Sequence, residues 1–117
     1  MRTLKEALIN KSNIGKVSKD KEYFIYTTNK YETVWTLKHK LKAYEIDNDV
    51  NYMWLLSKKQ LNEIFNKYIT VRNDTGAKLY IVPSRKDLEK IKNAPKYWWL
   101  SDFIKEFGLI LIANPAR

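Results

Sequence analysis

The sequence predicts a small single domain of the α+β class, with a mixed or antiparallel sheet and several short helices. Segments rich in β-branched and aromatic residues interleave with segments whose apolar residues recur at helical spacing. One turn sequence between two strand-like segments indicates a hairpin, which favours a mixed or antiparallel sheet. With 117 residues, 44% of them hydrophobic, the chain can bury a core without disulfides.

The N-terminal part is predicted to be a short helix followed by a polar tether. Thr3 and Glu6 form a capping-box pair, in which each side chain bonds the backbone N–H of the other residue, and the helix extends to residue 11. Residues 12–21 are polar and show no apolar periodicity, so we expect few contacts to fix them. We therefore divide the chain into residues 1–21 and an α+β domain of residues 22–117.

Two strands and one ambiguous segment follow. Residues 22–28 and 50–56 are rich in β-branched and aromatic side chains, which predicts strands. Residues 31–45 fit both a helix, by the spacing of their apolar residues, and a half-buried strand, by alternation with lysines. Because leucine and lysine favour helices and Thr28-Asn29 offers caps, we predict a helix there.

The next segment predicts a capped helix and a hairpin. Ser57 and Gln60 form a second capping-box pair, and apolar residues at helical spacing continue to residue 68. Residues 69–71 and 78–82 flank the sequence Asn-Asp-Thr-Gly at 73–76, which is typical of a hairpin turn.

Two further helices and a strand complete the prediction. Residues 83–93 begin with Pro-Ser and place Asp87 at the capping-box position of a helix. Residues 101–107 predict a short helix that Gly108 ends, since glycine readily adopts the left-handed conformation after a helix. Residues 109–113 are apolar and predict a buried strand or core segment.

The chain is strongly basic. It has 22 lysines and arginines against 13 aspartates and glutamates, a net charge of +9. This charge favours an acidic partner, either nucleic acid or an acidic protein. Eighteen of the bases are lysines, which contact phosphates as point charges and do not read base edges as arginine does, so we expect binding without sequence specificity. Codon bias in AT-rich coding sequence is an alternative source of the lysine excess.

Several function classes are excluded by what the composition lacks. The chain has no cysteine, which rules out disulfides and thiolate chemistry and favours a reducing, intracellular compartment. No apolar run approaches the roughly 20 residues that span a bilayer, so we expect no membrane partner and a cytoplasmic location.

Two groups of residues are candidates for partner binding. Three lysines alternate with other residues within 31–45; on a strand they would share a face with tyrosine and tryptophan nearby, whereas on a helix they would diverge. The densest aromatic stretch, residues 97–100, offers rings that could stack on bases or anchor a protein, although one tryptophan would be expected to fill the core. The candidate binding residues are Lys38, Lys40, Lys42, Lys96, Trp98 and Trp99.

One tetrapeptide resembles a catalytic motif. Asp74-Thr75-Gly76-Ala77 is similar to the active-site sequence of retroviral-type aspartic proteases, in which two aspartates share a proton. Arg72 and Asn73 stand where those proteases have apolar residues, and Asn-Asp-Thr-Gly is an ordinary turn sequence. We therefore interpret the motif as a turn and expect no enzyme activity.

Metal sites are likewise not expected. Asp47, Asp49 and Asn51 imitate the first ligands of an EF-hand loop, but Lys58 stands where that loop needs its bidentate glutamate. His39 is the single histidine and cannot build a zinc site without cysteines or a carboxylate cluster, so we expect a surface or half-buried side chain. No metal and no cofactor are predicted.

The opening sequence MRTLKEALINKSNI, residues 1–14, resembles the start of many small proteins of tailed bacteriophages, in which a short amphipathic helix precedes unrelated domains. In some phages such a helix directs proteins into the assembling capsid. The resemblance implies a phage or mobile-element origin, the cytoplasm of a bacterial host as location, and packaging in a virion as an alternative. In a targeting helix Leu4, Leu8 and Ile9 would supply the contact; alternatively the helix docks on its own domain.

These observations lead to one functional hypothesis with two alternatives. We expect a non-enzymatic basic binding module of phage or mobile-element type, with nucleic acid as the first choice of partner. The first alternative is a packaged or structural virion protein, or an inhibitor that binds a host protein. The second is an aspartic-protease-like hydrolase, which depends on Asp74 alone. The sequence does not indicate an oligomeric state.

Overall fold

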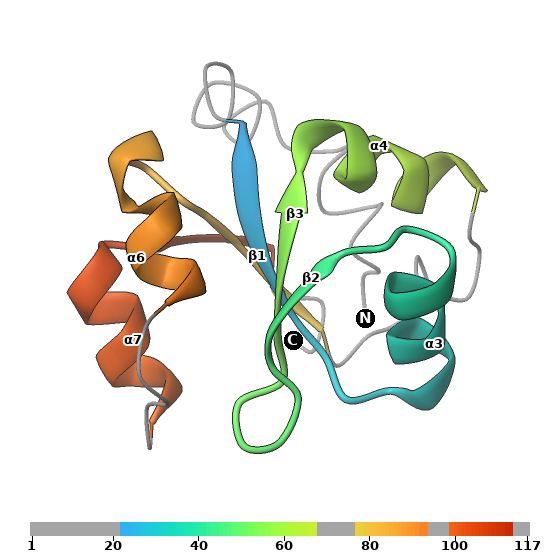
Figure 1. The fold of residues 1–117 in the computed structure, drawn as a ribbon, viewed down its shortest axis with the longest axis horizontal. Coiled ribbons are helices and arrows are strands. Elements are labelled where there is room, and N and C mark those ends of the chain that lie inside the picture. Colours follow the sequence, from blue (N-terminus) through green and yellow to red (C-terminus); the bar gives the residue numbers. More distant parts are fainter. Residues whose placement is uncertain (1–21, 68–76, 94–98, 114–117) are drawn as a thin grey trace.

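A five-stranded antiparallel sheet organises the fold, which confirms the predicted α+β class (Figure 1). The computed structural model describes residues 22–67, 77–93 and 99–113. Neighbouring strands follow the order β2-β3-β1-β4-β5. Strand β2 is therefore one edge of the sheet, paired with β3, and β5 is the other edge. The strands are β1 (Tyr23–Thr27), β2 (Tyr44–Asp47), β3 (Met53–Ser57), β4 (Lys78–Ile81) and β5 (Ile110–Ala113).

Helices cover both faces of this sheet. In Figure 1, α3 and α4 lie to the right of the sheet and α6 and α7 to its left. The two apolar clusters have the same division, because one contains residues of α3 and α4 and the other contains residues of α6 and α7. The helices are α3 (Tyr31–His39), α4 (Lys58–Lys67), α6 (Leu88–Lys92), preceded by the 3₁₀ turn η1 (Arg85–Asp87), and α7 (Leu100–Phe107).

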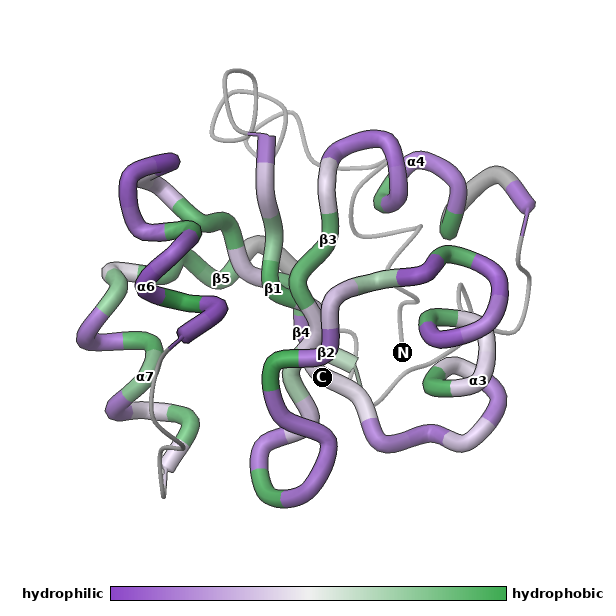
Figure 2. The backbone as a smooth tube through the Cα atoms, viewed as in Figure 1, coloured by the Kyte–Doolittle hydropathy of each residue, from purple (hydrophilic) through white to green (hydrophobic). Residues whose placement is uncertain are grey.

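The alternation of side chains along the strands builds the two cores. On β1, Phe24 and Tyr26 join the cluster of α3 and α4, whereas Ile25 joins the cluster of α6 and α7. Because both faces are covered, the central strands are apolar at nearly every position, as Figure 2 shows for β1 and β3. Tyr80 on β4 is also buried, and burial raises the pKa of its phenol.

The capping signals in the sequence place two helix ends correctly. The Ser57 N–H donates to Gln60 Oε1 at 2.8 Å and the Gln60 N–H donates to Ser57 Oγ at 3.2 Å, which is the predicted capping box at the start of α4. Gly108 follows α7 with φ 61°, in the left-handed conformation expected of it. Strands β1, β3 and β5 lie within the predicted segments 22–28, 50–56 with one added residue, and 109–113.

Two predictions about elements need correction, and a third lies partly outside the described residues. The predicted helix at 31–45 ends at His39, and residues 44–47 form the unpredicted edge strand β2. Of the predicted hairpin between 69–71 and 78–82 only the second strand is described, as β4, and its neighbours in the sheet are β1 and β5. Helix formation in 83–93 is confirmed for η1 and α6, but the Ser84 side chain makes no capping bond.

Several predictions fall outside the described residues. These are the helix at 3–11, the tether at 12–21, the segment 69–71 and the turn at 73–76. Across residues 22–67, 77–93 and 99–113, no helix combines the length and apolarity needed to cross a membrane.

Candidate nucleic-acid interface

The outer side of α3 carries a row of exposed rings. Tyr31, Trp35 and His39 are spaced four residues apart, which places them on one side of a helix. The opposite side carries Thr33 and Leu37, which are buried against the sheet, so the amphipathic pattern directs the rings to solvent. Tyr31 is 77% exposed and Trp35 is 44% exposed, which is unusual for side chains that usually stabilise cores.

The rings and a lysine contact one another. The centroids of Trp35 and His39 lie 5.1 Å apart with a tilt of 44°. Lys40 Nζ lies 5.4 Å from the centroid of Trp35, within the range of a cation–π contact. These contacts hold the indole on the surface, where it can be reached by a partner. We call Tyr31, Trp35 and His39, together with Lys38, Lys40 and Lys42, the α3 platform.

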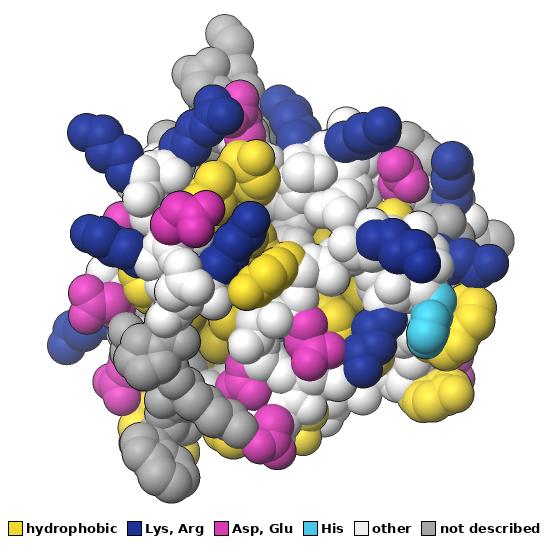
Figure 3. Space-filling view, in the orientation of Figure 1, with side chains coloured by type: hydrophobic (Ala, Val, Ile, Leu, Met, Phe, Trp, Pro, Cys, Tyr) yellow, Lys and Arg dark blue, Asp and Glu magenta, His cyan; other side chains and the backbone are white. Residues whose placement is uncertain are grey.

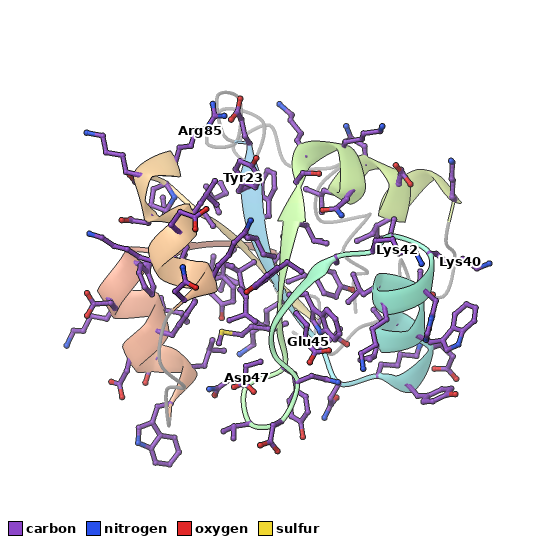
Figure 4. All side chains as sticks on the ribbon, in the orientation of Figure 1. Tyr23, Lys40, Lys42, Glu45, Asp47 and Arg85 are labelled. Atoms are coloured by element: carbon purple, nitrogen blue, oxygen red, sulfur yellow. The ribbon has the colours of Figure 1, made fainter. Side chains whose placement is uncertain are left out.

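The three predicted lysines lie at the C-terminal end of α3. All three are exposed, and Figure 4 shows Lys40 and Lys42 beside each other at the end of the helix. Lys38 Nζ lies 3.5 Å from Glu45 Oε1 on β2, but both side chains are more than two-fifths exposed, so solvent screens this pair. The lysines therefore do not form the single strand face considered from the sequence; they lie in the last turn of α3 and in the three residues that follow it.

The chain leaves α3 through a turn that favours glycine but contains a lysine. The Leu41 N–H donates to the Thr36 carbonyl at 3.0 Å and the Ala43 N–H donates to the Leu37 carbonyl at 2.9 Å, so backbone bonds satisfy two carbonyls at the end of the helix. Lys42, the residue before Ala43, has a φ of 55°, in the left-handed conformation. Residues other than glycine are mostly disfavoured in the left-handed conformation. The lysine at position 42 therefore lowers the stability of the folded state relative to a glycine there.

A hollow adjoins the aromatic row. It has a volume of about 400 Å³ and is lined by Tyr31, Glu32, Trp35 and Thr36. Thr36 is buried at its base, with its hydroxyl donating to the Glu32 carbonyl at 2.9 Å. The side chain of Glu32 is exposed and has no ion-pair partner among the described residues. The hollow therefore combines two ring walls with one carboxylate.

A second contact between a ring and a lysine joins Tyr44 of strand β2 to Lys92 of α6. Lys92 Nζ of α6 lies 5.3 Å from the centroid of the Tyr44 ring, and the Tyr44 hydroxyl donates to the Lys92 carbonyl at 3.2 Å. Tyr44 is 43% exposed. In the space-filling view, lysines and arginines occupy both sides of this face, and His39 in cyan lies beside hydrophobic atoms at its right (Figure 3).

Of the second group of predicted residues, the structure describes Trp99 and places it away from the platform. Trp99 precedes α7 and is 68% exposed, but α7 packs on the face of the sheet opposite α3. The other predicted binding and targeting residues lie outside the described part of the chain: Lys96, Trp98, Leu4, Leu8 and Ile9. Sequence reasoning missed Tyr31 and Trp35, although their spacing of four residues was a signal that a helix would expose both together.

The metal-like sequence at residues 47–51 is a hydrogen-bonded turn. The carboxylate of Asp47 accepts bonds from the N–H groups of Asp49, Val50 and Asn51 at 3.0 to 3.2 Å. The carboxylate thus stabilises the connection from β2 to β3. In the described residues, no group of three or more His, Asp or Glu side chains could hold a metal ion.

The protease-like motif 74–77 lies outside the described residues except for Ala77, which is fully buried.

Comparison of the chain with protein-family models, curated proteins and solved structures finds no match. Its function is therefore inferred from the chemistry of its own surface.

Proposed function

We propose that this chain is a non-enzymatic module that binds single-stranded nucleic acid through the α3 platform, without requiring a fixed sequence. The observation that supports the proposal is the row of exposed rings on α3 with exposed lysines at the C-terminal end of the helix, one of them in contact with Trp35. Proteins that bind single strands in a sequence-tolerant way combine these two features, because every base has a face that can stack and every nucleotide has a phosphate.

Single strands suit this surface better than a duplex. The bases of a duplex are stacked on each other, so exposed indole and phenol rings gain contact only with bases that are already unstacked. Lys40, whose Nζ lies 5.4 Å from the centroid of the Trp35 ring, is near enough to meet a phosphate that flanks a base stacked there. We propose the cytoplasm of a bacterial host, for a protein of phage or mobile-element origin, as the setting of this activity.

The decisive experiment replaces one exposed tryptophan and uses the other as a matched control. Fluorescence anisotropy with a labelled oligothymidylate would compare the wild type with Trp35→Ala and Trp99→Ala. Stacking contributes about 1–3 kcal/mol per base, so we expect Trp35→Ala to weaken binding about fivefold or more. Trp99→Ala should bind like the wild type, because Trp99 is also exposed but precedes α7, which packs on the opposite side of the sheet.

Two results would count against the proposal. Equal losses for both tryptophan variants would show that α3 is not the interface. No binding by the wild type even at low salt would remove nucleic acid as the partner. An acidic protein would then be the better candidate, since exposed aromatic residues and cations also anchor protein interfaces.

A further inference from the structure

The hollow beside the aromatic row contains a chemical group that a nonspecific phosphate-binding surface does not need. Glu32 contributes a carboxylate to the lining, in a chain whose net charge is +9. This carboxylate repels phosphate and has no cation paired with it among the described residues. It can, however, accept hydrogen bonds from a neutral ligand that carries N–H groups.

The other walls of the hollow determine what kind of ligand fits. Tyr31 and Trp35 are separated by one helical turn and line the hollow together with Glu32. A flat, neutral ring with donors on its edge would stack on one of these rings and direct its donors toward the carboxylate. Nucleobases have this combination, and among them guanine alone presents two adjacent N–H donors, at N1 and N2, to match the two oxygens of a carboxylate.

We propose that this hollow is a guanine-selective subsite, in which Glu32 accepts bonds from the N1 and N2 donors while the base stacks on Tyr31 or Trp35. The inference rests on the proposed binding of single strands and adds one base preference to an otherwise sequence-tolerant surface. Adenine and cytosine offer an amino group next to a ring acceptor, which faces the carboxylate unfavourably. Thymine and uracil offer one N–H between two carbonyl oxygens and are the poorest ligands of the subsite.

The test compares oligonucleotides of the same length. One contains thymine only, one contains guanine at every third position, and one contains inosine in place of guanine, which removes the N2 amino group. We expect the wild type to bind the guanine probe about fivefold more tightly than the thymine probe, the lower end for a bidentate contact with a base. The inosine probe should bind with an affinity close to that of the thymine probe.

The matched variant is Glu32→Gln, which keeps the size of the side chain and replaces one acceptor oxygen by a donor. It should lose the guanine preference while binding the thymine probe at least as well as the wild type. Circular dichroism of the variant should match that of the wild type, because Glu32 is exposed.

The outcomes separate this inference from the proposed function. If the wild type binds all three probes equally, the subsite is refuted and single-strand binding stands. If the guanine preference persists in Glu32→Gln, the base is read elsewhere and the inference is wrong. If no probe binds at low salt, the subsite and the proposed function fail together.

Discussion

At the scale of single residues, the backbone angle of Lys42 connects stability with the proposed function. Its φ of 55° places it in the left-handed conformation, at a helix end where glycine is common. Tyr52, which ends the turn stabilised by Asp47, has the same φ. Side chains in this conformation cost free energy, and such costs gather at functional sites. At Lys42 the conformation costs folding free energy, and in return the protein has a cation at the end of the α3 platform, where it can contact a phosphate.

Lys42→Gly should therefore change stability and binding in opposite directions. The free energy of unfolding in urea should rise by about 1 kcal/mol, because glycine adopts positive φ without a steric penalty. Affinity for a single strand should fall, because one phosphate contact is lost. Lys42→Gln is the control: it should weaken binding to the same extent without adding stability. A glycine variant that is less stable than the wild type would contradict the assigned conformation.

At the scale of elements, Gln60 joins the start of α4 to the end of α3. Its carbonyl completes the capping box with Ser57, and its Nε2 donates to the Leu41 carbonyl at 2.9 Å. The capping box could be predicted from the sequence because it is local, whereas the bond to Leu41 could not, since it depends on how two helices pack.

Two substitutions separate these roles. Gln60→Glu retains the capping acceptor but cannot donate to Leu41, so we expect it to lower the free energy of unfolding by about 1 kcal/mol. Gln60→Ala loses both bonds and should cost about 2 kcal/mol. Urea unfolding measures both values, with Lys59→Ala, an exposed neighbour in the same turn, expected to stay within about 0.5 kcal/mol of the wild type. If Gln60→Glu and Gln60→Ala lowered the free energy of unfolding equally, the whole contribution of the Gln60 side chain would come from its bond to the Leu41 carbonyl.

The sequence predicted elements where the signal is local and failed where pairing is distant. Helix α7 and its glycine end follow from adjacent residues, as does the start of α4. Strand β2 was missed because it has only four residues, and Tyr44 also fits the helical spacing of the apolar residues in 31–45. The neighbours of β4 could not be predicted, since β1 lies about fifty residues earlier in the chain.

Of the residues in the candidate site, the sequence analysis named the lysines as binding residues and did not name the aromatic residues. The lysines at 38, 40 and 42 were identified by their spacing, and the structure exposes all three. Tyr31 and Trp35 share one side of the predicted helix, but their spacing does not tell whether that side faces solvent or the core; the burial of Thr33 and Leu37 on the other side of α3 decides it. Trp99 was chosen for its aromatic neighbours, but tertiary packing places α7 on the far side of the sheet.

At the scale of the whole molecule, the charge of +9 predicts how binding should respond to salt. Each lysine that contacts a phosphate displaces condensed counterions, so the logarithm of affinity for single strands falls by about 0.7 per contact for each tenfold rise in salt. If Lys38, Lys40 and Lys42 each contact a phosphate, replacing all three with glutamine should make this slope shallower by about 2. Anisotropy titrations at several salt concentrations measure the slope.

A matched triple variant distinguishes a site from a generally basic surface. Lys86, Lys90 and Lys105 are also exposed, but they belong to η1, α6 and α7 on the other side of the sheet. Replacing them with glutamine removes the same net charge from the molecule, so any effect of overall charge on distant attraction is the same in both variants. We expect the control to retain most of the wild-type slope, because its lysines release no counterions from a strand bound at α3. Equal reductions in slope would mean that the strand contacts the whole basic surface, and that the lysines of the α3 platform have no separate role.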